Sequence, residues 1–265
     1  MPLHAFSRTE MLIGREGLDK LSRSRVAVFG IGGVGTFVVE GLARAGIGRL
    51  VLVDDDDICL TNINRQIHAL ASTVGKSKVE VMKERVLDIN PGAEVDARQC
   101  LYNAKTSGEL LDPGYDYAVD AIDMISSKLD LIEKCQAMDV PIISCMGAGD
   151  KMDPTKFHVA DIYETSICPL AKVMRKELRR RGVPGLKVVY STEPPMETLE
   201  IESDCRSGCV CTNMDRTCAD RRHIPGSMSF VPSVAGLIIA SEVVKDLLLN
   251  KVKNSGHALQ QAGPE

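Results

Sequence analysis

Residues that could bind a nucleotide are concentrated in the first third of the chain. An apolar run at 26–29 leads directly into the turn Gly30-Ile-Gly32-Gly33-Val-Gly35, and a second apolar run at 51–53 ends in Asp54. Glycines at a strand-to-helix turn let backbone N–H groups approach phosphate at the helix N-terminus, although an ordinary tight turn has the same composition. An acid at the end of the second strand can accept hydrogen bonds from ribose hydroxyls. The spacing predicts the opening of a nucleotide-binding βαβ unit.

Three polar residues further along indicate which nucleotide is bound. Asn62 and Arg65 form an Asn-x-x-Arg segment, and Lys78 opens a predicted helix. The guanidinium fork of arginine suits phosphate oxygens and developing negative charge. A lysine at this point is within reach of phosphates, although most lysines at helix starts are plain surface charges. We expect Arg65 and Lys78 at the mouth of the site, where neither supports the core. Because a dinucleotide needs none of the three residues, the set favours ATP chemistry over hydride transfer.

Two acids lie at and just beyond the end of the predicted strand at 117–121. Asp120 and Asp123 stand where a carboxylate could hold a Mg²⁺ ion that bridges the phosphates of a nucleotide. Helix N-capping is the alternative role of Asp123, because a helix is predicted to start shortly after it. We take Asp123 as the candidate magnesium ligand.

Four cysteines lie within fourteen residues of the second half: Cys205, Cys209, Cys211 and Cys218. Thiolates at this density are typical of tetrahedral Zn²⁺, but the spacing differs from the common pair of Cys-x-x-Cys knuckles. Sulfur-carrying thiols and plain free thiols are the alternatives. Because the segment has few large apolar residues, it cannot become ordered by burying them in a core. In a reducing compartment, where disulfides do not form, we expect a bound zinc ion to order it instead.

Positive charge also gathers in the second half. The predicted helix at 169–181 and a segment near residue 220 carry nine basic residues: Arg175, Lys176, Arg179, Arg180, Arg181, Arg216, Arg221, Arg222 and His223. Such a face fits an RNA backbone, but a solvated helix face has the same composition. Both interpretations stay open.

The composition bounds the class of protein. The 265 residues, 44% of them hydrophobic, suffice for one large α/β domain, and the net charge of −4 does not by itself indicate a nucleic-acid binder. Residues 1–25 lack the apolar region of a secretory signal, and an odd count of nine cysteines indicates reduced thiols in the cytoplasm. The apolar stretch 227–249 contains a proline and three charged residues, so we expect a core helix rather than a membrane span.

The elements that position these residues alternate along the chain. Strands are predicted at 25–29, 50–53, 94–97, 117–121, 141–145, 158–161 and 187–191, and helices at 6–24, 33–45, 76–90, 126–138, 169–181 and 234–250. This alternation implies a doubly wound, mostly parallel, Rossmann-like α/β sheet that binds ligands beyond the carboxyl ends of its strands. We expect one domain over 1–250, with a smaller C-terminal extension, a Cys-rich insert at 196–224 and a flexible tail at 251–265. Leu12 is an apolar position of the first predicted helix.

Together with Gly147-Ala-Gly149, these segments resemble the ubiquitin-activating-enzyme-like (ThiF/MoeB/HesA) superfamily over about residues 7–249. The later segments at 147–155, 161–170 and 187–193 are similar to one branch, the tRNA threonylcarbamoyladenosine dehydratases. They are the specific part of the resemblance, because sulfur-carrier adenylyltransferases share mainly the first half.

The resemblance implies a homodimeric enzyme that uses ATP to activate the carboxylate of threonylcarbamoyladenosine, next to the tRNA anticodon, and then cyclises it. It implies that ATP and Mg²⁺ are bound by Gly33, Asp54, Asp56, Asn62, Arg65, Lys78 and Asp123, with the last three acting in catalysis. Adenylation of a ubiquitin-like sulfur carrier is the alternative, because it uses the same ATP site. The cluster at 205–218 departs from many relatives. Cys218 could correspond to a sulfur-accepting cysteine of some of them, which would add a cysteine desulfurase or a sulfur-acceptor protein as a partner.

Overall fold

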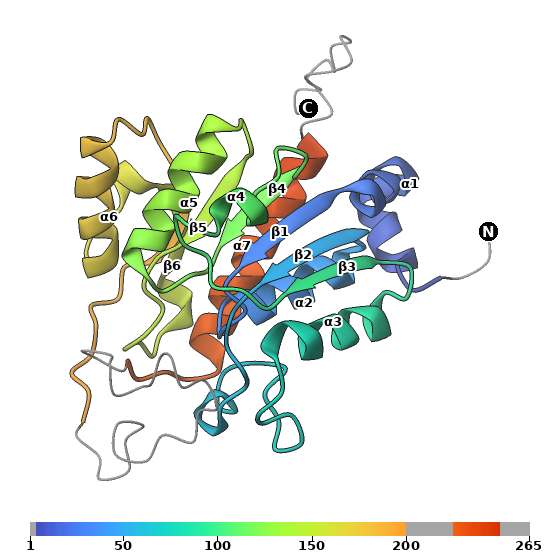
Figure 1. The fold of residues 1–265 in the computed structure, drawn as a ribbon, viewed down its shortest axis with the longest axis horizontal. Helices are drawn as coiled ribbons and strands as arrows, with labels where there is room; N and C mark the ends of the chain where they lie inside the picture. Colours follow the sequence, from blue (N-terminus) through green and yellow to red (C-terminus); the bar gives the residue numbers. More distant parts are fainter. Residues whose placement is uncertain (1–3, 200–224, 250–265) are drawn as a thin grey trace, which may run out of the picture.

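The computed structural model describes residues 4–199 and 225–249 (Figure 1). The predicted zinc ligands between 205 and 218, the basic cluster at 216–223 and the predicted tail at 251–265 lie outside the described residues.

Seven strands form one sheet in the order β3-β2-β1-β4-β5-β7-β6. Their bounds are β1 Arg25–Phe29, β2 Arg49–Val53, β3 Glu94–Arg98, β4 Tyr117–Asp120, β5 Ile142–Cys145, β6 Phe157–Asp161 and β7 Lys187–Ser191. Neighbouring strands pair in parallel, except that β6 is antiparallel to β7. The predicted mostly parallel α/β fold is confirmed, and β7 and β6 extend the same sheet as the first five strands.

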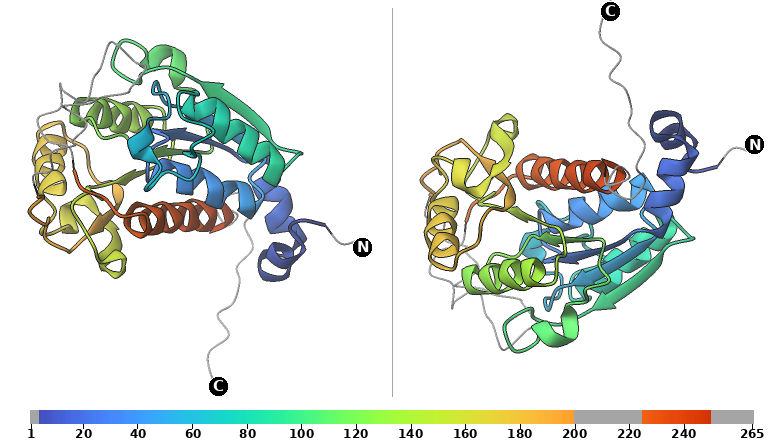
Figure 2. Two further views of the ribbon diagram at one scale, coloured as in Figure 1. Left: turned by 90° about the horizontal axis from the view of Figure 1, so that it is seen from below. Right: turned by 90° about the horizontal axis from the view of Figure 1, so that it is seen from above.

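Helices cover both faces of this sheet (Figure 2). Their bounds are α1 Ser7–Arg23, α2 Gly35–Ala45, α3 Lys78–Ile89, α4 Ser107–Leu110, α5 Ile125–Ala137, α6 Pro169–Arg180 and α7 Phe230–Leu249, with short 3-10 helices η1 Leu60–Asn62, η2 Pro154–Lys156 and η3 Ile162–Glu164. Helices α2, α3 and α7 share one buried cluster with the sheet, and α4, α5 and α6 share the other. This is the doubly wound arrangement that the sequence predicts.

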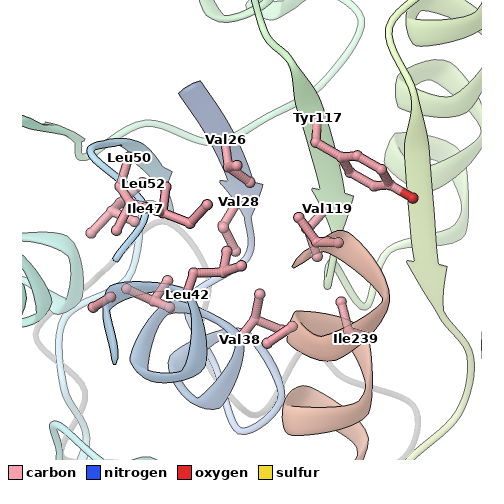
Figure 3. Close-up of a cluster of buried hydrophobic side chains, with 14 of the residues drawn as sticks. Val26, Val28, Val38, Leu42, Ile47, Leu50, Leu52, Tyr117, Val119 and Ile239 are labelled. Atoms are coloured by element: carbon pink, nitrogen blue, oxygen red, sulfur yellow. The ribbon is translucent and has the colours of Figure 1, made fainter. Parts of the chain in front are cut away.

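The central strands are apolar on both faces because helices bury both faces. Val26 and Val28 of β1 belong to the cluster that contains Leu42 of α2 and Ile239 of α7 (Figure 3), whereas Phe29 belongs to the opposite cluster. All five side chains are fully buried. Packing on both faces therefore fixes the positions of the strand ends, from which the site residues follow.

Helix α4 was not predicted from the sequence, and α1 and α7 also differ from the sequence-based expectations. Leu12 is 87% exposed, because Gly14, with φ of 68°, interrupts α1 and turns its first part away from the line of the second. Helix α7 begins at Phe230, four residues before the predicted start at 234. Within the described part of the chain, no helix combines the length and apolar character needed to cross a bilayer.

Candidate nucleotide-binding site

The predicted site residues meet where the strand order of the sheet reverses. Strands β2 and β3 lie on one side of β1, and β4, β5, β7 and β6 follow on the other side. Gly30 comes directly after β1, and the loop that contains Asp123 comes directly after β4. In open parallel sheets, ligands bind in the crevice outside the carboxyl ends of the strands at such a reversal.

The glycines of the turn have different physical roles. A Cβ on Gly30 would stand 2.6 Å from the Ala121 carbonyl oxygen, and φ there is +90°. A Cβ on Gly35 would stand 1.8 Å from the carbonyl oxygen of Gly30. Gly32 is different, because its Cβ would have only the Nε2 of Gln66 within 4 Å, at 3.9 Å. Gly30 and Gly35 therefore close the turn, while Gly32 leaves its backbone accessible to a ligand.

The start of α2 favours an anion. Its N-cap, Val34, makes no side-chain capping hydrogen bond, and the first turn contains no acidic residue. The first N–H groups of a helix lack partners within the helix and carry partial positive charge. A phosphate group is the ligand that this geometry suits best.

Asp54 connects the second strand to the glycine turn. Its Oδ2 accepts a hydrogen bond of 2.6 Å from the backbone N–H of Ile31, and its Oδ1 accepts one of 3.0 Å from the N–H of Asp56. The carboxylate therefore fixes the turn against β2, in addition to the ribose contact that we expect of it.

Lys78 is not the surface charge that the sequence left open as an alternative. It is 5% exposed, and its Nζ lies 2.6 Å from Oδ2 of Asp56 and 3.5 Å from Oδ1 of Asp54. Burial alone would lower the pKa of Lys78, but the attraction of Asp54 and Asp56 outweighs it and raises the pKa. The expectation that Lys78 supports no part of the core is therefore wrong, because this ammonium holds the loop after β2 against α3.

Arg65 lies over the glycine turn. Its Cδ is 3.5 Å from the position that a Cβ on Gly33 would take. Its Nη1 donates hydrogen bonds of 2.9 Å to the carbonyl oxygen of Thr61 and to Oδ1 of Asn64. Arg65 is half-buried, and the aliphatic part of its side chain packs against Gly33, in the turn just before α2, so a phosphate contact by its guanidinium stays a prediction.

Asn62 is buried and has a structural role in the segment before Arg65. Its Oδ1 accepts a hydrogen bond of 3.0 Å from the N–H of Cys59, which closes η1. Asn62 therefore shapes the segment that presents Arg65 to the turn.

Asp120 and Asp123 differ sharply in their surroundings. Asp120 is fully buried, and its carboxylate contacts the Nζ of Lys128 at 2.8 Å and accepts a hydrogen bond of 2.5 Å from the Ser144 hydroxyl. The prediction that Asp120 could hold Mg²⁺ is wrong, because its oxygens are committed inside the protein. Asp123 is exposed, and the N-cap position of α5 is Met124 rather than Asp123.

Two buried side chains at the site, those of His68 and Lys128, were not among the residues predicted from the sequence. The Nε2 of His68 lies 3.1 Å from the carbonyl oxygen of Ile31, and burial lowers the pKa of His68 to about 4, so the ring is neutral near pH 7. Lys128 reaches the loop after β4 from α5. Its burial could have been predicted from its spacing of three residues from Leu131, which is also buried, because residues three apart share one face of a helix.

Several basic residues of α6 and its C-cap have partners within the protein. Arg175 donates a hydrogen bond of 2.8 Å to the carbonyl oxygen of Thr165, and Arg180 and Arg181 form ion pairs with Glu177 and Glu133. The end of α6 also precedes β7, so it lies at the amino edge of the parallel strands, opposite the glycine turn. These contacts favour the interpretation of a solvated helix face for this half of the basic cluster.

Comparisons with known proteins agree with this geometry. The ThiF family matches residues 6–264 of the chain. The tRNA threonylcarbamoyladenosine dehydratase of Bacillus subtilis (strain 168) is 49% identical over 93% of this chain and 95% of its own length. The Escherichia coli tRNA N6-threonylcarbamoyladenosine dehydratase, TcdA, in its crystal structure in complex with ATP, is 32% identical, with a TM-score of 0.81 over 95% of this chain and 96% of that chain.

A sulfur-carrier enzyme matches over a shorter stretch. The sulfur carrier protein ThiS adenylyltransferase of Escherichia coli (strain K12) is 33% identical over 54% of this chain and 58% of its own length. The dehydratases, in contrast, match over nearly the full length of both proteins. The chain belongs to the ThiF family and, within it, to the tRNA threonylcarbamoyladenosine dehydratases.

Proposed function

We propose that this protein is an ATP-dependent dehydratase that cyclises threonylcarbamoyladenosine in tRNA. The substrate carboxylate attacks the α-phosphate of ATP, and pyrophosphate leaves. The neighbouring carbamoyl group then attacks the activated carbonyl carbon and expels AMP, which carries away one of the former carboxylate oxygens. Because both reacting groups belong to one nucleoside, holding it in place supplies the proximity that the ring closure needs, and no enzyme nucleophile is required.

The observation that carries this proposal is the packing of the Arg65 side chain against Gly33, in the turn just before α2. This side chain lies at a helix N-terminus that has no acid in its first turn. A cation at this point stabilises the charge that develops on the phosphates as pyrophosphate leaves. Lys78 acts in this scheme chiefly through Asp54 and Asp56, which it holds in place beside the turn.

Asp123 is the proposed magnesium ligand. Its carboxylate is exposed at the carboxyl edge of β4, and carboxylate oxygens are ligands that Mg²⁺ prefers. When bound, the ion would neutralise phosphate charge. Asp123 fits a magnesium ion better than Asp120 does, because Asp123 is exposed whereas Asp120 is completely buried.

The test is the product formed from ATP. Purified protein, ATP, Mg²⁺ and tRNA that carries threonylcarbamoyladenosine should give AMP and pyrophosphate in amounts equal to the cyclised nucleoside. Omitting the tRNA should abolish AMP formation. ADP and phosphate in place of AMP and pyrophosphate would refute the proposed mechanism.

The alternative is adenylation of a ubiquitin-like sulfur carrier, which the match to the ThiS adenylyltransferase supports over about half of each protein. Exchange of pyrophosphate into ATP that depends on a small sulfur-carrier protein, and not on tRNA, would favour it. The homodimer, the cytoplasmic location, the desulfurase or sulfur-acceptor partner and zinc at 205–218 stay predictions. Metal analysis of protein purified without chelators tests the zinc.

A further inference from the structure

The side chain of Lys128 is completely buried beneath the site and uses all the donors of its ammonium group. Its Nζ lies 2.8 Å from Oδ2 of Asp120, 2.8 Å from the carbonyl oxygen of Cys145 and 3.1 Å from the carbonyl oxygen of Ile122. An ammonium has three N–H donors, so these three contacts satisfy it. Neither Lys128 nor Asp120 exposes any of its side chain.

These partners lie at the carboxyl ends of β4 and β5 and in the loop after β4, where the rim of the site is formed. Ile122 directly precedes Asp123, and Cys145 ends β5, shortly before Gly147. Asp120 itself accepts a hydrogen bond of 3.1 Å from the N–H of Ile122. A single side chain from α5 therefore connects the loop after β4 to the carboxyl end of β5.

The loop after β4 also supports the glycine turn. The Ala121 N–H donates a hydrogen bond of 2.8 Å to the carbonyl oxygen of Phe29, which ends β1. The carbonyl oxygen of Ala121 occupies the space where a Cβ on Gly30 would stand. A shift of the peptide between Ala121 and Ile122 would therefore displace both Asp123 and the glycine turn.

Stability alone does not account for a charge pair in this position. Removing two charges from water carries a large free-energy cost, and a buried pair is often replaced by apolar residues with no loss of stability. The pair supplies directed hydrogen bonds to two backbone carbonyls, which an apolar side chain would leave without donors. We propose that Lys128 is a positioning residue of the nucleotide site, which fixes the backbone that presents Asp123 and supports Gly30; this rests on the proposed function, through the assignment of Asp123 to Mg²⁺-bound ATP.

The experiment compares the double variant Asp120→Asn/Lys128→Met with the wild-type protein. The pair of changes leaves no lone buried charge, and the asparagine amide keeps an acceptor for the Ile122 N–H, so we expect folded protein. Calorimetric titration should show Mg²⁺-ATP binding weakened by about 10- to 100-fold, the range typical of residues that orient a metal ligand. Hydrogen exchange of the loop at 121–124, measured without nucleotide, should become faster. Asp123→Asn should reproduce the loss of Mg²⁺-ATP affinity without the faster exchange.

Lys134→Met is the matched control. Lys134 also lies on α5 and pairs with Asp130 at 2.9 Å, but it does not contact the rim of the site. We expect its Mg²⁺-ATP affinity to stay within about twofold of wild type, since the described contacts of Lys134 are with Asp130 and Ser107. If the double variant does not fold, Lys128→Arg tests the proposal instead. This variant keeps the positive charge beside Asp120 but replaces the ammonium by a planar guanidinium. The arginine variant should bind Mg²⁺-ATP more weakly than wild type.

Wild-type affinity for Mg²⁺-ATP in a folded Lys128 variant would overturn the proposal. This outcome is separate from a failure of the proposed function. If the wild-type protein binds Mg²⁺-ATP but forms no AMP with modified tRNA, the dehydratase assignment fails and the role of Lys128 is still decided by the titration.

Discussion

The ammonium of Lys78 lies 2.6 Å from Oδ2 of Asp56, although 22 residues separate them along the chain. The contact joins the first turn of α3 to the loop after β2, and Asp54 adds a second carboxylate at 3.5 Å. The lysine is therefore part of the structure of the site as well as a candidate for its chemistry.

Lys78→Ala should lower stability as well as activity. The change leaves Asp54 buried without its cation, and the loss of a charged hydrogen bond should lower the free energy of unfolding by about 2–3 kcal/mol. Urea unfolding measures this. Lys76→Ala removes an exposed lysine next to the same helix and should change stability by less than about 0.5 kcal/mol. Equal stability of Lys78→Ala and wild type would mean that the ion pair contributes nothing to the fold.

Arg65→Ala should lower turnover and leave the fold intact. Arg65 is half-buried and donates hydrogen bonds to Thr61 and Asn64, which are both exposed, so we expect the core to tolerate its loss. A charge-assisted phosphate contact is worth about 1.5–3 kcal/mol, which predicts a loss of about tenfold or more in adenylation rate. Single-turnover AMP formation and thermal unfolding are measured together. Arg65→Lys should recover part of the rate, because it keeps the charge but loses the fork.

Two glycines of the same turn should give opposite outcomes. Gly35→Ala would place a methyl group 1.8 Å from the Gly30 carbonyl oxygen, so we expect the turn to be disrupted and little folded protein to form. Gly32→Ala has room for its methyl group and should fold, but the methyl would stand where a phosphate approaches the backbone. Thermal unfolding with and without ATP distinguishes the two: Gly32→Ala should melt like wild type without ATP and gain less stability when ATP is added.

The pH dependence of stability should report on His68. Burial lowers its pKa from 6.5 to about 4. The unfolded chain therefore binds this proton more tightly than the folded protein does, and acid favours unfolding. The neutral His68 ring makes its full contribution to the free energy of unfolding above pH 6.5. That contribution is lost as the pH falls from 6.5 toward 4, by about 3 kcal/mol in total.

His68→Gln removes this group while retaining an amide that can donate to the Ile31 carbonyl. Urea unfolding at about pH 7.5, 6 and 5 should show a shallower pH dependence in this variant than in wild type. An unaltered slope in His68→Gln would show that His68 is not buried as a neutral ring.

Features encoded over a few residues were determined by the sequence itself. The apolar run at 26–29 followed by Gly30 and Gly35 specifies a strand and a tight turn, because backbone sterics and burial on both faces leave few other conformations. Alternation of such runs with helical patterns specifies the doubly wound sheet, and hence the edge where Arg65 and Asp123 lie.

Contacts between distant segments were decided only by the tertiary structure. Whether Lys78 was a surface charge or a buried partner of Asp56, and whether Asp120 met a metal or Lys128, depended on how α3 and α5 pack against the sheet. Local sequence specifies the period of a helix, but which charges lose their water and must find partners depends on packing between elements far apart in the chain. Leu12 shows the converse, since a turn at Gly14 leaves an apolar helix position exposed.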